Sequence, residues 1–262
     1  MLGGFMKIKL MSALMSLIIL LLAACGSHGD NITRTEDAHT YEGYPVVYVV
    51  PDVSSQGLLS AYELLESPDY AAIAIQLSDT KMDESFEWSD LIDKLSESLV
   101  GSTVIETTQE LELSSYNSVV IISHFRSHET IGFNGAVKRM ADISQYVGDS
   151  NLGPNDQSIF ERVAEAGKHT LDNTGSQILY INVMDRLSVE SGGVSLPDTN
   201  TYSVGIFSSY DPVAVDQACV DMLYMIQEGA SFAAHIESCR GIDTLIHAER
   251  IGLGSRTYAM TI

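Results

Sequence analysis

Residues 118–139 read SVVIISHFRSHETIGFNGAVKR, and this stretch decides the fold class. It begins with an uninterrupted apolar run, Val119–Ile122, whose β-branched side chains favour a strand. Polar residues and two glycines, Gly132 and Gly135, follow directly. Uninterrupted hydrophobicity is typical of strands covered on both faces, as in parallel sheets with flanking helices. The stretch therefore predicts a buried strand that ends in a polar turn.

Comparable apolar runs recur along the chain and alternate with helical patterns. The further predicted strands are Val46–Val50, Ala72–Leu77, Thr103–Glu106, Gln177–Val183 and Tyr202–Phe207. The predicted helices are Gln56–Glu66, Phe86–Leu99, one capped by Asp156 and closed near Gly175, one opened by Asp211-Pro212, and Ile242–Ile251. Strands that alternate with helices predict an α/β protein with a mostly parallel or mixed sheet and flanking helices.

The N-terminal residues are typical of a secretion signal. Lys7 and Lys9 precede the apolar run Met11–Leu22, and two alanines separate that run from Cys25. The run is shorter than the roughly 20 residues that span a bilayer. Leu22-Ala23-Ala24-Cys25 resembles the lipobox of bacterial lipoproteins, which predicts cleavage before Cys25 and a lipid on its thiol. An ordinary signal peptide with a chance cysteine and a transmembrane anchor are the alternatives.

This interpretation divides the chain into three parts. Residues 1–24 are the expected signal peptide, residues 25–43 a lipidated flexible tether without apolar periodicity, and residues 44–262 a single α/β domain. The expected location is the bacterial cell envelope, outside the cytoplasm, with the lipid on Cys25 holding the protein to a membrane. The sequence leaves open whether that membrane is the inner or the outer one.

Charge and cysteine content narrow the classes of function. The formal net charge is -21, so phosphate backbones would repel the chain, and nucleic-acid binding is not expected. Apart from Cys25 the chain has only Cys219 and Cys239, which we expect to be free and buried rather than paired. Two cysteines cannot supply a four-cysteine site, so no iron–sulfur cluster is expected from this chain alone.

The polar turn after Ile122 carries the main candidate site. His124 and His128 have the four-residue spacing that can bind a divalent metal, on a helix or on a loop. Gly132 and Gly135 would let backbone amides approach an anion, and Lys138 could supply a positive charge. The alternative is a turn whose glycines serve geometry and whose polar side chains are solvated.

Three further groups of residues are candidates for a site. Asn182 and Asp185 follow the predicted strand Gln177–Val183, at the strand end where α/β proteins bind ligands. Asp216 and Asp221 could act as paired carboxylates, but helical spacing favours a solvated helix face. A metal trio of His235, Cys239 and His247 is a further, non-specific possibility.

The motifs resemble those of the domain-of-unknown-function family 362, whose members are often fused to a ferredoxin-like iron–sulfur module. The similar stretches are SHFRSH (123–128), GFNGAVKR (132–139), ILYINV (178–183), SYDPVAVDQACVD (209–221) and IGLGSR (251–256). The resemblance covers most of the chain after the signal. It implies an α/β scaffold and assigns both histidines and Lys138 to a family motif.

Departures from the family pattern shape the functional expectation. The segment joining the strands Thr103–Glu106 and Val119–Ile122 is short, and the loop at residues 188–193 lacks the family's Cys-x-Cys pair. Arg126 and Ser127 replace a lysine and a glycine. We therefore expect a lipid-anchored protein with a ligand-binding or accessory role, whose partner is a protein or a small anionic ligand. The alternative is an enzyme with a metal or anion site at His124, His128 and Lys138, with no cofactor named by the sequence.

Overall fold

The computed structural model describes seven segments of the chain: residues 39–63, 72–75, 103–106, 118–143, 157–175, 177–188 and 201–262. The predicted helix Phe86–Leu99, the expected signal peptide and Cys25 lie outside these segments. The described chain begins close to β1 (Thr40–Tyr41), which pairs with β2 (Tyr44–Val50). Residues 39–43, at the end of the tether expected over residues 25–43, therefore belong to the folded domain.

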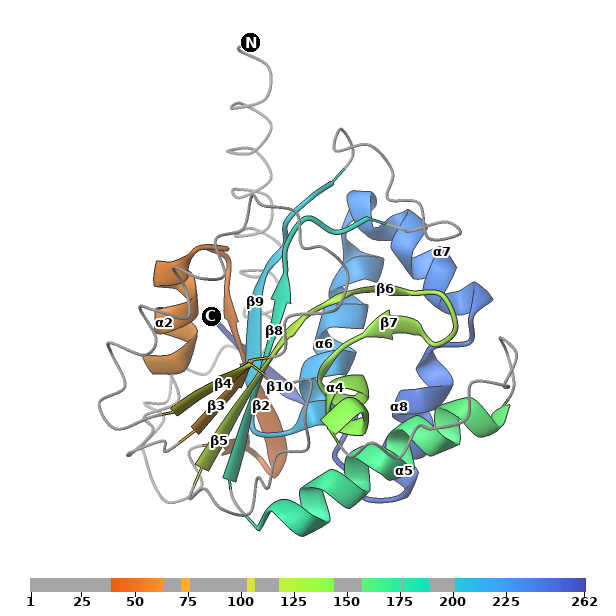
Figure 1. Cartoon of the computed structure of the whole chain (residues 1–262). Coiled ribbons are helices and arrows are strands. Elements are labelled where there is room, and N and C mark those ends of the chain that lie inside the picture. The colour runs from red at the N-terminus through yellow and green to blue at the C-terminus, as the bar shows by residue number, and fades with distance from the viewer. Residues whose placement is uncertain are drawn as a thin grey trace.

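A mixed sheet forms the centre of the molecule (Figure 1). Its order is β1-β2-β9-β8-β5-β3-β4, with β10 (Ala259–Thr261) added beside β2. The strands β3 (Ala72–Ile75), β4 (Thr103–Glu106), β5 (Ser118–His124) and β8 (Gln177–Met184) run parallel to one another. β9 (Gly205–Ser209) is antiparallel to both β8 and β2. The expected α/β class with a mixed sheet is confirmed.

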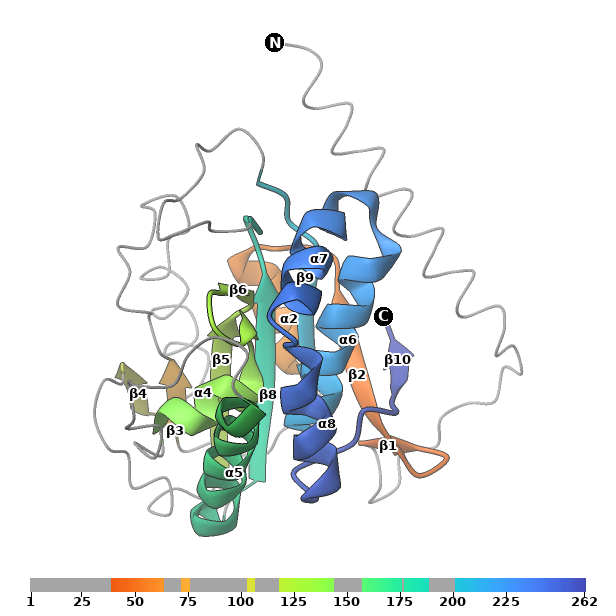
Figure 2. The ribbon, with the colours of Figure 1, turned by 90° about the vertical axis from the view of Figure 1, so that its right-hand side faces the viewer.

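Helices cover both faces of the sheet. The helix α2 (Ser55–Glu63) lies on one face, against β2 and β9. The opposite face carries α4 (Ala136–Ile143), α5 (Gln157–Thr174), α6 (Pro212–Met225), α7 (Ala230–Ser238) and α8 (Ile242–Arg250). Figure 2 shows these five helices in front of the strands, with α2 behind. A short 3-10 turn, Gln227–Gly229, joins α6 to α7.

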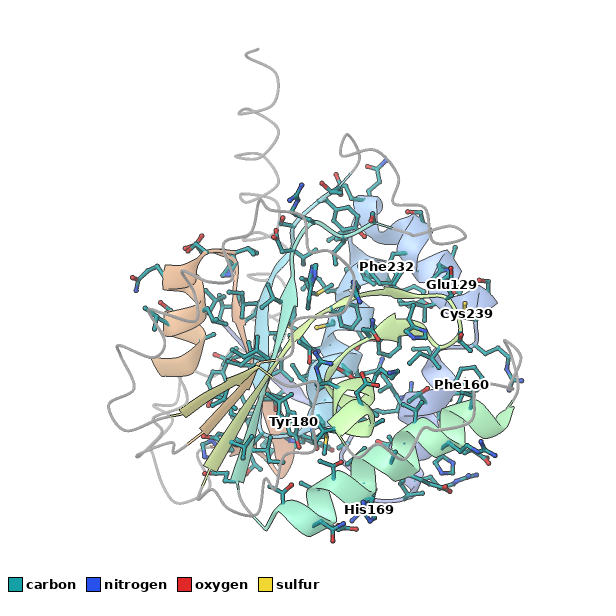
Figure 3. The ribbon with its side chains drawn as sticks, viewed as in Figure 1. Glu129, Phe160, His169, Tyr180, Phe232 and Cys239 are labelled. Carbon is teal, nitrogen blue, oxygen red and sulfur yellow. The ribbon has the colours of Figure 1, made fainter. Side chains whose placement is uncertain are left out.

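The main core lies between the sheet and the larger helical layer. Phe125, Phe160, Tyr180 and Phe232 are almost completely buried there. The last three are labelled in Figure 3. The ring of Phe125 packs against those of Phe133 and Phe232, at centroid distances of 5.3 and 5.9 Å. Burying such large apolar side chains supplies most of the driving force for packing these layers together.

The described elements follow the sequence prediction closely in their positions. All six predicted strands are present, although β9 begins at Gly205 rather than at Tyr202. Asp211 caps α6 and Pro212 occupies its first turn, as expected. The sequence interpretation assigned no helix to Ala230–Ser238 and did not identify the hairpin of β6 (Arg126–His128) and β7 (Gly132–Asn134). Within the described segments no helix is both long and apolar enough to cross a bilayer.

Candidate functional site

The chain reverses its direction across the sheet between β3 and β5. From β3 it moves to β4 at the outer edge, whereas from β5 it passes through α4 and α5 to β8 on the other side. The carboxyl ends of β3 and β5 therefore form a topological switch point, where open α/β sheets bind their ligands. β5 ends at His124, so the first candidate residue lies at this point.

His124 is tied to the end of the neighbouring strand. Its Nε2 lies 2.7 Å from the backbone oxygen of Asp185, directly after β8. Burial is the main cause that lowers the pKa of His124, and the charges of Arg126 and Arg186 lower it further. The imidazole is therefore neutral at pH 7, and its Nε2–H donates to Asp185. The structure thus brings together two predicted site residues, His124 and Asp185.

His128 belongs to a different environment. Its Nδ1 accepts hydrogen bonds from the backbone N–H groups of Thr130 and Ile131, at 3.1 and 3.3 Å. These bonds hold the turn between β6 and β7. Burial lowers the pKa of His128 to about 4, with Lys138 as the second cause. The two histidines lie on successive strands, β5 and β6, rather than on one helix face.

Lys138 lies on α4, where it pairs with an acid of its own helix. Its Nζ contacts Asp142 one turn later, and Arg139 lies 3.5 Å from the same carboxylate. Lys138 is close enough to His128 to affect its pKa. The sequence-predicted trio therefore lies on three different elements, β5, β6 and α4, with Lys138 near His128.

The anion that approaches the glycine turn is part of the protein itself. Asp216 of α6 accepts hydrogen bonds from the backbone N–H groups of Ala136 and Val137, at 2.7 and 3.0 Å, and so caps α4. A Cβ atom on Gly135 would lie 2.3 Å from Asp216 Oδ1. Gly135 thus admits an internal carboxylate at the place where the sequence predicts contact with an external anion. Gly132, at φ +85°, lies against the backbone of Ile236 and Gly241 and so serves packing.

Asn182 completes this internal contact. Its Nδ2 donates to Asp216 Oδ1 at 2.7 Å and lies 3.6 Å from Cys219 Sγ. Asn182 and Asp216 are fully buried, so the predicted solvated face for Asp216 is wrong. The reason is that the face of α6 that carries Asp216 packs against the sheet and α4. Burial raises the pKa of Asp216 to about 6, opposed by the hydrogen bond from Asn182.

Two other family motifs meet at the start of α6. Asp211 accepts hydrogen bonds from Val213 and Ala214 in its own helix and from Ser255 in the C-terminal segment. A Cβ atom on Gly254 would lie 2.1 Å from Asp211 Oδ1. The IGLGSR motif therefore docks onto the DPVA motif, and Gly254 leaves room for the carboxylate of Asp211.

The next turns of α6 continue this docking with side chains. Arg256 Nε donates to Gln217 Oε1 at 2.8 Å, and Tyr258 donates to Asp221 Oδ2 at 2.8 Å. Gln217 in turn donates to Asp221 Oδ1 at 2.7 Å. Asp221 thus helps to fasten the C-terminal segment, which continues into β10.

The helix α7 supports the β6–β7 hairpin. His235 Nε2 lies 3.1 Å from the backbone oxygen of His128, and Cys239 Sγ lies 3.3 Å from that of Glu129. Figure 3 shows Glu129 beside Cys239 at this edge. Cys219 and Cys239 are both free and buried, as predicted. His247 lies elsewhere, on α8 against Glu161 and Glu165 of α5. The described segments contain no group of three metal-binding side chains.

Sequence reasoning missed three residues of this region. The sequence assigns Asp216 to the surface, because the contact between Gly135 and a carboxylate 81 residues later leaves no signal in the local sequence. Arg126 and Arg186 flank the His124–Asp185 contact and were not considered as site residues. Their positions directly after two strand ends offered a signal that could have identified them.

These features define an α/β protein with a mixed sheet, a polar contact beside its switch point and a helix capped by a buried aspartate. A family model described as domain of unknown function (DUF362) matches residues 87–221, slightly more than half of the chain. The chain therefore belongs to the DUF362 family. No curated protein and no solved structure matched the chain significantly.

Proposed function

We propose that this DUF362 protein is a lipid-anchored, extracytoplasmic protein that binds a small ligand at the carboxyl ends of β5 and β8 without converting it. The observation that carries the binding role is the His124–Asp185 contact at the carboxyl ends of β5 and β8, beside the switch point between β3 and β5. A neutral imidazole and the ends of two parallel strands form a fixed, polar rim there.

The residues of the alternative enzyme site favour binding of the ligand over its conversion. His128 Nδ1 is used in the hairpin turn, Lys138 is paired with Asp142, and Gly135 and Asn182 serve Asp216. Each of these groups has a structural partner, which favours a scaffold role over a role in turnover. The bonds of His124 and Asp185, in contrast, hold these residues at the carboxyl ends of β5 and β8, where we place the ligand.

The membrane attachment rests on the sequence around Cys25. The run Met11–Leu22 followed by two alanines and a cysteine has the order that lipoprotein processing requires. We expect metabolic labelling with a radioactive fatty acid to mark the wild-type protein and not the Cys25→Ser variant. A Cys25→Ser variant that still carries the label would contradict the anchor.

Ligand binding is tested on protein purified from the envelope. Native mass spectrometry should show a bound small molecule that is lost in the His124→Ala variant. His169→Ala serves as the matched control, because His169 is an exposed histidine on α5, where Asn173 contacts it. Equal occupancy in wild type and His124→Ala, or no ligand in either, would contradict the proposed site.

A further inference from the structure

Backbone hydrogen bonds bring two arginines to the ends of adjacent strands. The N–H of Phe125 donates to the backbone oxygen of Val183 at 2.9 Å, and His124 bonds to the backbone oxygen of Asp185. Arg126 follows Phe125, and Arg186 follows Asp185. The two side chains therefore start from neighbouring positions on the same edge of the sheet.

The alternation of side chains directs Arg126 to the same side as His124. The chain is extended from β5 into β6, so residues two apart lie on one side. Ser123 and Phe125 point to the buried side, where they are 3% and 0% exposed. His124 and Arg126 are both partly buried and lie on the opposite side, away from this core.

The backbone that carries Arg186 is held in a fixed conformation. Its φ of +48° is in the left-handed region, which a non-glycine residue adopts at an energetic cost. The N–H of Arg186 donates to Ser203 Oγ at 3.3 Å, and that hydroxyl donates to the carboxylate of Asp185. The backbone bond from Leu187 to Tyr202, at 2.8 Å, closes the turn. Backbone strain of this kind clusters at binding sites.

The local charge contrasts with that of the whole chain. The chain has 14 basic and 35 acidic residues, yet two arginines affect the same imidazole at this edge. One acid, Asp185, also acts on this imidazole, and it accepts a hydrogen bond from Ser203. A guanidinium group presents paired N–H donors that match the two oxygens of a carboxylate or a phosphate.

We propose that Arg126 and Arg186 bind an oxyanion, the carboxylate or phosphate group of a small ligand, beside His124 at the carboxyl ends of β5 and β8. The Nε2–H of the neutral His124 imidazole is engaged by the backbone oxygen of Asp185, so the guanidinium groups supply the charge and the donors for the anion. This inference rests on the proposed binding function and names the chemistry of its ligand.

Isothermal titration calorimetry at constant ionic strength tests the proposal, with inorganic phosphate and malonate as probes and the full-length protein in detergent. We expect at least one probe to bind, and Arg126→Gln and Arg186→Asn each to weaken its binding about tenfold or more. Asparagine is chosen at residue 186 because it tolerates a positive φ. Arg186→Lys should retain part of the affinity, since it keeps the charge but not the paired donors.

Arg250→Gln is the matched control, because Arg250 is an exposed arginine that contacts Glu161 on α5. It should leave the affinity unchanged. Binding of neither probe, or equal weakening by the control, would overturn the proposal. If neither probe binds while the purified protein still retains a ligand that depends on His124, the proposed binding function stands and only the oxyanion assignment fails.

Discussion

Asp216 Oδ1 on α6 accepts a hydrogen bond of 2.7 Å from the backbone N–H of Ala136, 80 residues earlier, at the start of α4. Oδ2 of the same carboxylate accepts from the next residue, Val137. One buried side chain thus caps a helix that belongs to a distant part of the chain. Three of the family motifs, at 132–139, 178–183 and 209–221, meet at this carboxylate through Ala136, Asn182 and Asp216.

Removing this carboxylate should destabilise the fold. Asp216→Ala leaves three buried donors without their acceptor, and each such loss costs about 1–3 kcal/mol, so we expect the free energy of unfolding to fall by about 3 kcal/mol or more. Urea denaturation measures the change. The control Asp172→Ala removes a surface acid and should alter stability by less than about 0.5 kcal/mol. Similar effects of both variants would contradict the clamp.

Gly135 and Asp216 should be energetically coupled. Gly135→Ala places a Cβ 2.3 Å from Asp216 Oδ1, so we expect it to cost about 2 kcal/mol or more in the wild-type background. In the Asp216→Ala background the collision is absent, and the same substitution should cost much less. A double-mutant cycle followed by denaturant unfolding gives the coupling energy. Additive effects would show that Gly135 is required for another reason.

Asp216 and His128 should influence stability in opposite directions below neutral pH. The folded pKa of Asp216 is raised from 3.8 to about 6, so between these values the folded state binds more protons, and Asp216 makes stability fall as pH rises. The folded pKa of His128 is lowered from 6.5 to about 4, so His128 makes stability fall as pH decreases across that window.

The two contributions are separated by mutation. Asp216→Asn removes the contribution of Asp216, so the free energy of unfolding should rise more steeply with pH between about pH 4 and pH 6 than in the wild type. His128→Gln removes the contribution of His128, so the free energy of unfolding should rise less steeply with pH than in the wild type. The slopes come from unfolding free energies at several pH values. Parallel pH profiles for all three proteins would contradict the assignment of these protons.

Gly254 should be required for docking of the C-terminal segment. A Cβ there would lie 2.1 Å from Asp211 Oδ1, so Gly254→Ala must displace either the α6 cap or the Ser255 bond. We expect a loss of about 2 kcal/mol and faster hydrogen exchange in β10. Gly175→Ala is a control with open space around the site, although its positive φ adds a small strain of its own. Unchanged exchange in β10 for Gly254→Ala would contradict the docking role.

Much of the fold could be predicted because its strands are local apolar runs. β4 and the start of β8 coincide with their predicted bounds, and Asp211-Pro212 marked the start of α6. The hairpin of β6 and β7 was missed because its strands have three residues each and contain polar side chains. α7 was missed as well; in the folded protein it packs against that hairpin.

The candidate site was predicted less well, because its residues were judged by spacing along the chain. The glycine turn was predicted as a place where backbone amides meet an anion, and the structure places the buried carboxylate of Asp216 there. His124 and Asp185 were assigned separately, and the structure joins them. Arg126 and Arg186 acquire a shared role only when β5 and β8 lie side by side.

The sequence by itself determined the α/β class, the positions of the strands, the cap of α6 and the family motifs, since these depend on local hydrophobic patterns and capping residues. The tertiary structure decided which polar residues belong to the interior and which form the rim of a site. A buried carboxylate and a solvated one can have the same helical spacing. Only the packing of α6 against α4 and β8 removes water from Asp216, and only the pairing of β5 with β8 brings Arg126 and Arg186 close to His124.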